Sequence, residues 1–454
     1  MKTTKLYFKK LVCAAAILAV MTSVSCGSVD DGSSDQNPTS AAAEISDSSQ
    51  AEQTESSSTD TSSEDDKKPD QPSEEIPLSD EFINGYNNFS IELFKKAAGD
   101  DLADNRNVLL SPESAIMALG MTANGANGDT LDSMLDVLCG GLPIDDFNIN
   151  MLNMKNMSEN SEGLTFNIAN SIWVRDEADR IKLNGEFADK ASEYFGADVF
   201  LKQFDSATLD EINSWVDENT NHMIPSILNR INDTAVTYLI NAIAFESEWA
   251  EQYEEKQILE ERDFTTADGE VQKVTMLASA EREYISGDGV TGFIKPYKGG
   301  DYAFMALLPD ENTSISDYAE SMTGENFKSL FDSRKYCDVA VQMPEFTYDY
   351  DRSLSNPLID MGMGTAFETS ADFSGMAETD TDMLYIQEVL QKTYIKLDRN
   401  GTKAAAATAV IMTDAAEAET PEPEVVILDR PFIYAIVDTE NGLPVFLGAV
   451  NSVK

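Results

Sequence analysis

The most informative segment of the chain is Gly401-Thr402-Lys403-Ala404-Ala405-Ala406-Ala407-Thr408-Ala409-Val410, which begins a long stretch between two predicted strands. Because alanine is the best helix former, one interpretation is a short exposed helix followed by a linker. Read with a period of two, every second side chain from Thr402 to Val410 is small or β-branched and falls on one face. The segment can therefore also enter a sheet as a strand without steric obstruction. Long loops of this kind are usually functional.

The chain before this segment begins with helix signals. Phe82, Tyr86, Phe89 and Leu93 recur at helical spacing, and Ser111-Pro112-Glu113-Ser114 caps a second apolar helix. Alternating or continuous apolar runs predict strands at 165–174, 238–245, 302–308, 339–346, 394–397, 432–437 and 444–450. Because the helix signals come first and the strand signals later, the sequence predicts an α+β domain. No break in composition divides residues 80–454, so we expect them to form a single domain.

The first 79 residues carry signals for export. Four lysines precede a short apolar run and a small-residue site at Ser23 and Ser25, which predicts a signal peptide over residues 1–25. Ser25-Cys26-Gly27 resembles a bacterial lipobox in which Cys26 is diacylated, although Ser23 stands where that motif prefers Leu. Residues 26–79 are acidic and rich in serine, which predicts a disordered tether. We expect an extracellular protein, secreted or held at the cell surface as a lipoprotein, which touches a membrane only through the lipid.

Composition excludes several functional classes. The chain has 81 Asp and Glu against 32 Lys and Arg, a net charge of −49 and a single histidine, His222. Such a chain is repelled by nucleic acids, whose binding requires Lys and Arg. One histidine cannot build a His-ligated zinc site or a two-histidine relay, and no GxSxG motif accompanies it. We therefore expect no metal, no cofactor and no enzymatic activity, with His222 at the surface or hydrogen-bonded.

Two cysteines, Cys139 and Cys337, remain in the predicted domain. A disulfide between them is compatible with export, but nothing in their spacing argues for one. Buried free thiols are the default prediction.

The region from Asp80 to Lys454 resembles a serpin, a member of a family of serine protease inhibitors. The motifs that carry the resemblance are Asn107-Val108-Leu109-Leu110-Ser111-Pro112-Glu113-Ser114, Ile168-Ala169-Asn170-Ser171-Ile172-Trp173-Val174, Asn241-Ala242-Ile243-Ala244-Phe245 with Trp249, Ala371-Asp372-Phe373-Ser374-Gly375-Met376, Gly401 to Ala407, Asp429-Arg430-Pro431-Phe432, and Pro444-Val445-Phe446-Leu447-Gly448 ahead of Asn451. Their number and order make a chance similarity very improbable.

The resemblance implies three β-sheets, about nine helices and an exposed reactive-centre loop over about 401–429. It also implies a suicide mechanism. A target protease attacks the loop and forms an acyl-enzyme, and the cleaved loop then inserts into a sheet before water can hydrolyse the ester. The partner would be a serine protease held in a covalent complex with a monomeric inhibitor.

The hinge of such a loop would comprise Gly401, Thr402, Lys403, Ala404, Ala405, Ala406, Ala407 and Thr408. Thr402 would be the first residue to insert facing inward, where an unpaired charge would cost several kcal/mol. The alanines keep the strand slim, as inhibitory members do. Lys403 replaces the usual Glu, but its side chain would face solvent after insertion.

The family also implies a shutter beneath the point where the sheet opens. Ser111, Ser114 and Asn241 would belong to it, and Gln391 stands where the family usually has a histidine. Because an amide both donates and accepts, the polar network can survive this change. Trp249 is placed with these residues in the shutter and the adjoining breach, but its expected role, like that of Phe373 and Phe432, is only to pack.

Counting from the hinge at the loop length usual in the family, the resemblance implies a reactive bond at Ala415-Ala416, with Met412, Thr413 and Asp414 as alternatives. Counting back from Pro431 would favour Thr420-Pro421, a bond that serine proteases cleave poorly. Small Ala415 suits an elastase-like pocket, and the absence of Lys or Arg between Val410 and Glu424 argues against trypsin-like targets.

Two further questions stay open at this stage. Without the signal's four lysines and the tether's fourteen acids and two lysines, the body keeps a net charge of about −41, which would steer cationic elastases or merely keep the protein soluble. The main alternative function is a non-inhibitory serpin-fold binding protein whose loop is only a substrate. Inhibition of subtilisin-like or cysteine proteases is also compatible with the loop.

Overall fold

The computed structural model describes residues 77–160, 164–176, 181–232, 235, 237–287, 289–379, 384–402 and 422–453. The chain divides into two compact units, residues 1–71 and 72–454, and all described residues belong to the second. The predicted signal peptide, Cys26 and nearly all of the predicted tether lie outside the described residues. Residues 403–421, which include most of the predicted hinge and the predicted reactive bond, also lie outside them.

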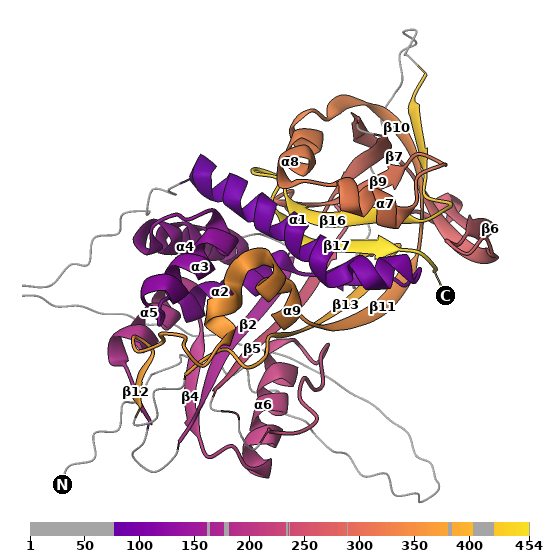
Figure 1. Cartoon of the computed structure of the whole chain (residues 1–454). Helices are drawn as coiled ribbons and strands as arrows, with labels where there is room; N and C mark the ends of the chain where they lie inside the picture. The colour runs from indigo at the N-terminus through magenta and orange to yellow at the C-terminus, as the bar shows by residue number, and fades with distance from the viewer. Residues whose placement is uncertain are drawn as a thin grey trace, which may run out of the picture. The chain divides into compact units, whose positions relative to one another are not determined.

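Nine α-helices occur in the described residues (Figure 1). They are α1 Asp80–Ala103, α2 Pro112–Ala123, α3 Gly128–Cys139, α4 Ile144–Asn160, α5 Gly185–Phe195, α6 Ser206–Asn219, α7 Ile315–Ser321, α8 Gly324–Asp332 and α9 Ser355–Leu358. Two begin where the sequence predicts. The Ser79 side chain caps α1, and the Ser111 hydroxyl accepts the Ser114 amide at the start of α2, with Pro112 in its first turn. Among the described helices, none combines the length and apolar character needed to cross a bilayer.

The largest sheet has nine strands, in the order β1-β17-β16-β9-β8-β7-β10-β15, with β6 also paired to β7. Their bounds are β1 Val108–Leu110, β6 Ile258–Thr265, β7 Val271–Gly287, β8 Val290–Pro296, β9 Tyr302–Pro309, β10 Lys335–Pro344, β15 Glu424–Ile427, β16 Phe432–Asp438 and β17 Pro444–Val450. All pairs are antiparallel except β10 with β15, which is parallel. Strand β15 forms one edge, and the two C-terminal strands β16 and β17 lie inside the sheet.

The second sheet has six strands, in the order β11-β13-β14-β5-β2-β4. Their bounds are β2 Leu164–Arg175, β4 Asp198–Lys202, β5 Thr237–Glu248, β11 Phe346–Ser353, β13 Leu390–Asp398 and β14 Gly401–Thr402. A third, two-stranded sheet pairs β3 Ile181–Leu183 with β12 Ala377–Thr379. The described residues thus form three sheets and nine helices in a mixed α+β fold, as the resemblance implied.

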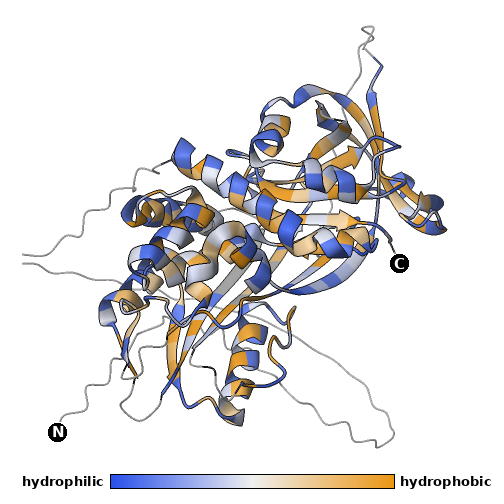
Figure 2. Ribbon diagram, viewed as in Figure 1, coloured by the Kyte–Doolittle hydropathy of each residue, from blue (hydrophilic) through white to orange (hydrophobic). Residues whose placement is uncertain are grey.

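Strand β5 is shared by all three hydrophobic cores. Leu239 packs with helices α1 to α5, while Ile243 and Phe245 pack against the nine-stranded sheet. The alternate residues Ile240 and Ala242 pack under α6, which lies apart from α1 to α5 in Figure 1. The prediction that this strand is buried on both faces is confirmed. Figure 2 shows the helices striped with hydrophobic and hydrophilic residues, as helices that cover a core should be.

Two expectations about the order of elements are wrong. Helices α7, α8 and α9 lie among the strands, so helices do not simply precede strands. The single strand predicted at 339–346 is two strands, because the chain passes from β10 to β11 at Glu345. The predicted strands at 302–308, 394–397, 432–437 and 444–450 are confirmed, with ends that differ by at most four residues.

Candidate functional site: the gap between β13 and β5

Strands β13 and β5 are paired at one end and separated at the other. Where both strands begin, which we call the lower end, they form parallel pairs, Leu390 with Ile240, Gln391 with Asn241 and Lys392 with Ala242. At the upper end β14 lies between them, with Thr402 opposite Leu397 on one side and Ser247 on the other. Between the two ends, the described residues provide no strand between residues 393–396 of β13 and 243–246 of β5. We call this region the gap.

The first two residues of the predicted hinge already belong to the sheet. Gly401 has a φ of +153° and approaches the Ser247 carbonyl so closely that no Cβ would fit. Thr402 is only 2% exposed, and its hydroxyl is 2.7 Å from the Tyr297 hydroxyl. Burial raises the pKa of Tyr297, which stays neutral. A small hydroxyl side chain therefore occupies the inward position at the top of the gap.

An aromatic pair closes the top of the gap. Trp249 stacks on Tyr297 with ring centroids 4.6 Å apart. The indole N–H of Trp249 donates to the Asp398 carbonyl at 2.9 Å, and its backbone N–H donates to the Asn400 carbonyl at 3.0 Å. The expectation that Trp249 only packs is wrong, since it also holds the turn that leads into β14.

An ion pair fixes the same turn from the other side. The backbone N–H and Nε of Arg399 both donate to Oε1 of Glu345 at 3.1 Å, and Nη2 donates to Oε2 at 3.3 Å. These bonds raise the pKa of Arg399. A bidentate contact between a guanidinium and a carboxylate fixes the relative orientation of the two groups. It therefore holds the turn before β14 in one orientation.

A buried ion pair lies next to this aromatic pair. Lys295 donates to Glu281 at 2.8 Å, and the two side chains are 3% and 8% exposed. The ammonium group also lies 5.3 Å from the Trp249 ring centre and 4.7 Å from that of Tyr253. This ion pair is buried away from water. Removing either partner alone would leave an unpaired buried charge and destabilise the fold.

The lower end of the gap is held by the predicted shutter residues. The Gln391 amide donates to the Ser111 carbonyl at 2.8 Å and accepts the Ser111 N–H at 2.9 Å, and the Ser111 hydroxyl donates to the Val445 carbonyl. The Ser114 hydroxyl has no hydrogen-bond partner among the described residues. Asn241 lies opposite Gln391 in the backbone register, and its side chain is outside the described residues. Gln391 thus both donates and accepts where the family usually has a histidine.

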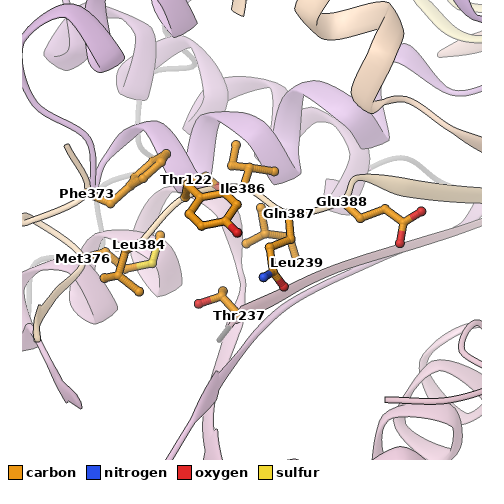
Figure 3. A pocket seen from close by; sticks show the side chains of 10 residues that line it. Thr122, Thr237, Leu239, Phe373, Met376, Leu384, Ile386, Gln387 and Glu388 are labelled. Carbon is orange, nitrogen blue, oxygen red and sulfur yellow. The ribbon is translucent and has the colours of Figure 1, made fainter. Parts of the chain in front are cut away.

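A small cavity of about 20 Å³ lies below the gap (Figure 3). Its walls are Thr122, Thr237, Leu239, Phe373, Met376 and residues 384–388. The Thr237 hydroxyl is buried there without a partner among the described residues. The volume suits about one water molecule. Phe373, expected only to pack, contributes to this cavity.

The predicted reactive-centre loop is shorter than 401–429 in the structure. Gly401–Thr402 is strand β14 at one end, and Glu424–Ile427 is strand β15 at the other, paired with β10. The expectation of an exposed loop over that whole range is therefore wrong at both ends. The hinge residues Lys403 to Thr408, the reactive bond Ala415-Ala416 and the alternatives Met412, Thr413 and Asp414 lie outside the described residues.

The single histidine and the two cysteines of the domain do not belong to the gap. His222 is an exposed residue just beyond α6, with Nδ1 2.7 Å from Asp217. Cys139 and Cys337 are free thiols; Cys139 is buried, whereas Cys337 is only half-buried, so the prediction of two buried thiols is wrong for Cys337. In the described part of the chain, no group of three or more His, Cys, Asp or Glu side chains is placed to hold a metal ion.

Sequence reasoning missed Tyr297, Glu345, Arg399 and Lys295. Tyr297 acts through Thr402, 105 positions away, and Arg399 through Glu345, 54 positions away, whereas Lys295 pairs with Glu281 across the β7–β8 hairpin. Nothing in the sequence around these tyrosine and charged residues indicates which partners they contact. Only the register of the sheets brings these side chains together.

Comparison with known proteins agrees with this architecture. The family model described as Serpin (serine protease inhibitor) matches residues 84–453. An uncharacterized serpin-like protein of Thermococcus kodakarensis is 30% identical over 383 residues, which are 82% of this chain and 86% of that protein. The native state of a thermophilic serpin, tengpin, is 40% identical with a TM-score of 0.77, over 84% of this chain and 97% of that one. Human thyroxine-binding globulin, at 21% identity and a TM-score of 0.72 over 82% and 98% of the two chains, shares the fold. The chain therefore belongs to the serpin family, whose members are as a rule protease inhibitors rather than enzymes.

Proposed function

We propose that this protein is an irreversible suicide-substrate inhibitor of elastase-like serine proteases, and that it acts by inserting its cleaved loop into the gap between β13 and β5. The observation that carries the proposal is strand β14, in which Gly401 and Thr402 already lie between these two strands. A strand that continued from Thr402 would need only to extend an existing ladder. Insertion would then separate the three residue pairs at the lower end.

The registers of β14 define the path that such a strand would take. Every second residue of the inserted loop would point into the core. On either side it would have a core-facing residue of β5 and one of β13. Along the path these are Phe245 and Ile243 on β5 and Ile395 and Thr393 on β13, all of them buried. Ala404 and Ala406 would be the residues placed against them. Because these neighbours are closely packed, only small side chains can enter without overpacking.

Further along the path the inward loop residues are larger. In the same register, Val410 and Met412 would lie opposite Leu239 and Thr237, which line the small cavity below the gap. The cavity holds only about one water molecule, so these side chains would have to be accommodated as β13 and β5 separate. The inward loop residues are thus small where they would enter and apolar further along the path.

The target class rests on the sequence of the loop and on charge. Small, uncharged Ala415 at the proposed reactive bond suits an elastase-like pocket, and a body charge of about −41 would attract a cationic protease. Raising the ionic strength should then slow association with a basic elastase. A flat salt response would remove the steering argument, leaving the pocket argument alone.

We also propose that the protein is exported and anchored through a diacylated Cys26. The support is the apolar run with its preceding lysines and the small residues around Cys26. Mass spectrometry of the protein from membranes of an expressing bacterium would detect a lipid-modified N-terminal Cys26. A soluble product in which the chain begins elsewhere would favour plain secretion.

The inhibition experiment mixes the purified protein with neutrophil-type and pancreatic elastases and analyses the products on denaturing gels. An adduct heavier than either partner is the expected result, together with a C-terminal peptide that begins at Ala416. Thr402→Arg places a charge at the inward position and should convert the inhibitor into a substrate. Lys403→Arg introduces the same side chain one position later, on the opposite face, and should still trap the protease.

Clean cleavage without an adduct would refute the proposal. If it were seen with elastases and also with chymotrypsin-like, subtilisin-like and cysteine proteases, the loop would be only a substrate. The protein would then be a non-inhibitory binding protein, as the shared fold with thyroxine-binding globulin makes conceivable.

A further inference from the structure

Two carboxylic acids are buried in the domain, Glu113 in the first turn of α2 and Asp438 at the end of β16. Their residues are 3% and 5% exposed. None of the ion pairs formed by the described residues includes either of them. A buried acid without a cation must keep its proton or be held by strong hydrogen bonds.

The two acids differ in their hydrogen bonds. Asp438 accepts the backbone N–H groups of Asn441 and Leu443, both at 2.7 Å, and the Asn441 side chain at 3.2 Å. Oε1 of Glu113 is buried and has no partner among the described residues. Burial raises the pKa of Asp438, and these hydrogen bonds oppose the rise, whereas Oε1 of Glu113 has no such bond.

The titratable groups around this pair are acidic or neutral. Tyr86 on α1 is electrostatically coupled to Glu113, Asp438 and Tyr302 on β9, and Asp438 is coupled to Glu440 in the turn before β17. Burial, and then the Asp438 charge, raise the pKa of Glu113 to about 8. Glu113 is thus a neutral acid at pH 7, and its ionisation would place a second charge beside Asp438.

Glu113 is connected to the lower end of the gap through its own helix turn. Ser111, two residues earlier, holds Gln391 on β13 and also bonds the Val445 carbonyl on β17. Tyr86 donates to the Pro444 carbonyl on the same strand. A displacement of the α2 N-terminus would therefore act directly on the residues that keep β13 and β5 paired.

We propose that Glu113 is a proton-controlled latch, which holds the start of α2 in place while its carboxyl is neutral and loosens the closed end of the sheet when it ionises. The proposal is independent of which protease, if any, the protein inhibits. It rests on a buried carboxyl oxygen of Glu113 without a partner among the described residues and on the short connection through Ser111 to Gln391; the charge of the second buried acid, Asp438, acts in the same direction.

The sign of the effect follows from the two protonation states. The pKa of Glu113 is about 8 in the folded protein, against 4.5 for the free side chain, so the folded state binds the proton more tightly. The stabilisation is complete below pH 4.5 and is lost as the pH rises through about 8. Between these values the folding equilibrium weakens by up to about tenfold per pH unit.

The first experiment compares the whole wild-type protein with Glu113→Gln, which keeps the shape but cannot ionise. Unfolding rates in a fixed urea concentration are followed by tryptophan fluorescence from pH 6 to pH 9. The ratio of wild-type to variant rates should rise by about fourfold or more, because part of the lost stability appears in the unfolding rate. Glu325→Gln, an exposed glutamate in the first turn of α8, is the matched control and should give a constant ratio. Parallel pH profiles for wild type and Glu113→Gln would overturn the proposal.

Two further measurements keep the proposal falsifiable if Glu113→Gln does not fold. Asp438→Asn removes the neighbouring charge, so the pH dependence of unfolding should move to lower pH, whereas a purely structural loss would lower stability equally at every pH. Hydrogen exchange of residues 390–392 should be faster in wild type at pH 9 than at pH 6, after correction for intrinsic exchange. An unmoved profile in Asp438→Asn or equal corrected exchange at the two pH values would contradict the latch.

Discussion

The hydrogen bond between Tyr297 and Thr402 predicts how firmly the hinge is held in the sheet. Both hydroxyls are buried and lie 2.7 Å apart. Tyr297→Phe removes one of them and leaves the other in the sheet interior without its partner. Such an unpaired group costs about 1–3 kcal/mol, which corresponds to about a 5- to 150-fold change in an equilibrium constant. The population in which Gly401 and Thr402 leave the sheet should increase by that factor.

Hydrogen exchange measured by mass spectrometry is the direct assay. In the regime where closing is faster than exchange, the exchange rate of the Gly401 and Thr402 amides is proportional to the population of the open hinge. The ratio of rates between Tyr297→Phe and wild type therefore gives the change in opening. Tyr336→Phe, at a tyrosine on β10 that is 80% exposed, removes the same atom without a buried partner and should leave the hinge unchanged.

A double variant separates the hydrogen bond from simple packing. In Tyr297→Phe with Thr402→Val, both polar groups are gone and the volumes are nearly kept, so much of the protection should return. Exchange of the hinge that is unchanged in Tyr297→Phe would refute the reasoning. A double variant that opens even more than Tyr297→Phe alone would refute it as well.

Three other variants or measurements test the surroundings of the gap. Gln391→Leu leaves the buried N–H of Ser111 unpaired, whereas the Ser111 carbonyl keeps the Ala115 N–H, and should lower the free energy of unfolding by about 1–3 kcal/mol; a loss below about 0.5 kcal/mol would contradict this assignment. Lys295→Met leaves Glu281 buried without its cation and should cost about 3–5 kcal/mol, most of which Lys295→Met with Glu281→Leu should restore; equal urea stability of single and double variants would argue against a charge effect. Cys139 is buried and its thiol pKa is raised to about 11 by burial, so an alkylating reagent should modify Cys337 in the native protein and Cys139 only after unfolding; peptide mapping that found equal modification would show that the α3 end opens readily.

The sequence predicts the interior strands well and the exposed ones poorly. Strands β16 and β17 are almost wholly apolar, so their composition alone identifies them. Strand β7 is 17 residues long but includes Glu281-Arg282-Glu283 and several exposed positions, so it has neither a clean alternation nor a continuous apolar run. A strand whose outer face meets solvent and whose register is set by three neighbours cannot be read from its own residues.

The site shows the same division between local and distant causes. Thr402 and Gln391 could be named from motifs, because their neighbours in the sequence carry the resemblance. The pairing of Arg399 with Glu345 depends on where β10 ends, and the electrostatic effect of Asp438 on Glu113 depends on how α2 packs on the C-terminal strands. Both pairings arise from tertiary packing, which a motif records only in part.

Strands β16 and β17 lie inside the nine-stranded sheet, although they follow the segment 403–421 in the chain. A cut anywhere in that segment would leave the C-terminal piece bound by β9 and β1 on its two sides, by Tyr86 through Pro444 and by Ser111 through Val445. The cleaved molecule would therefore be a non-covalent heterodimer of its own two fragments. The C-terminal piece, expressed separately, would be a candidate for reassembly with the rest of the domain, much as one half of a split protein complements the other.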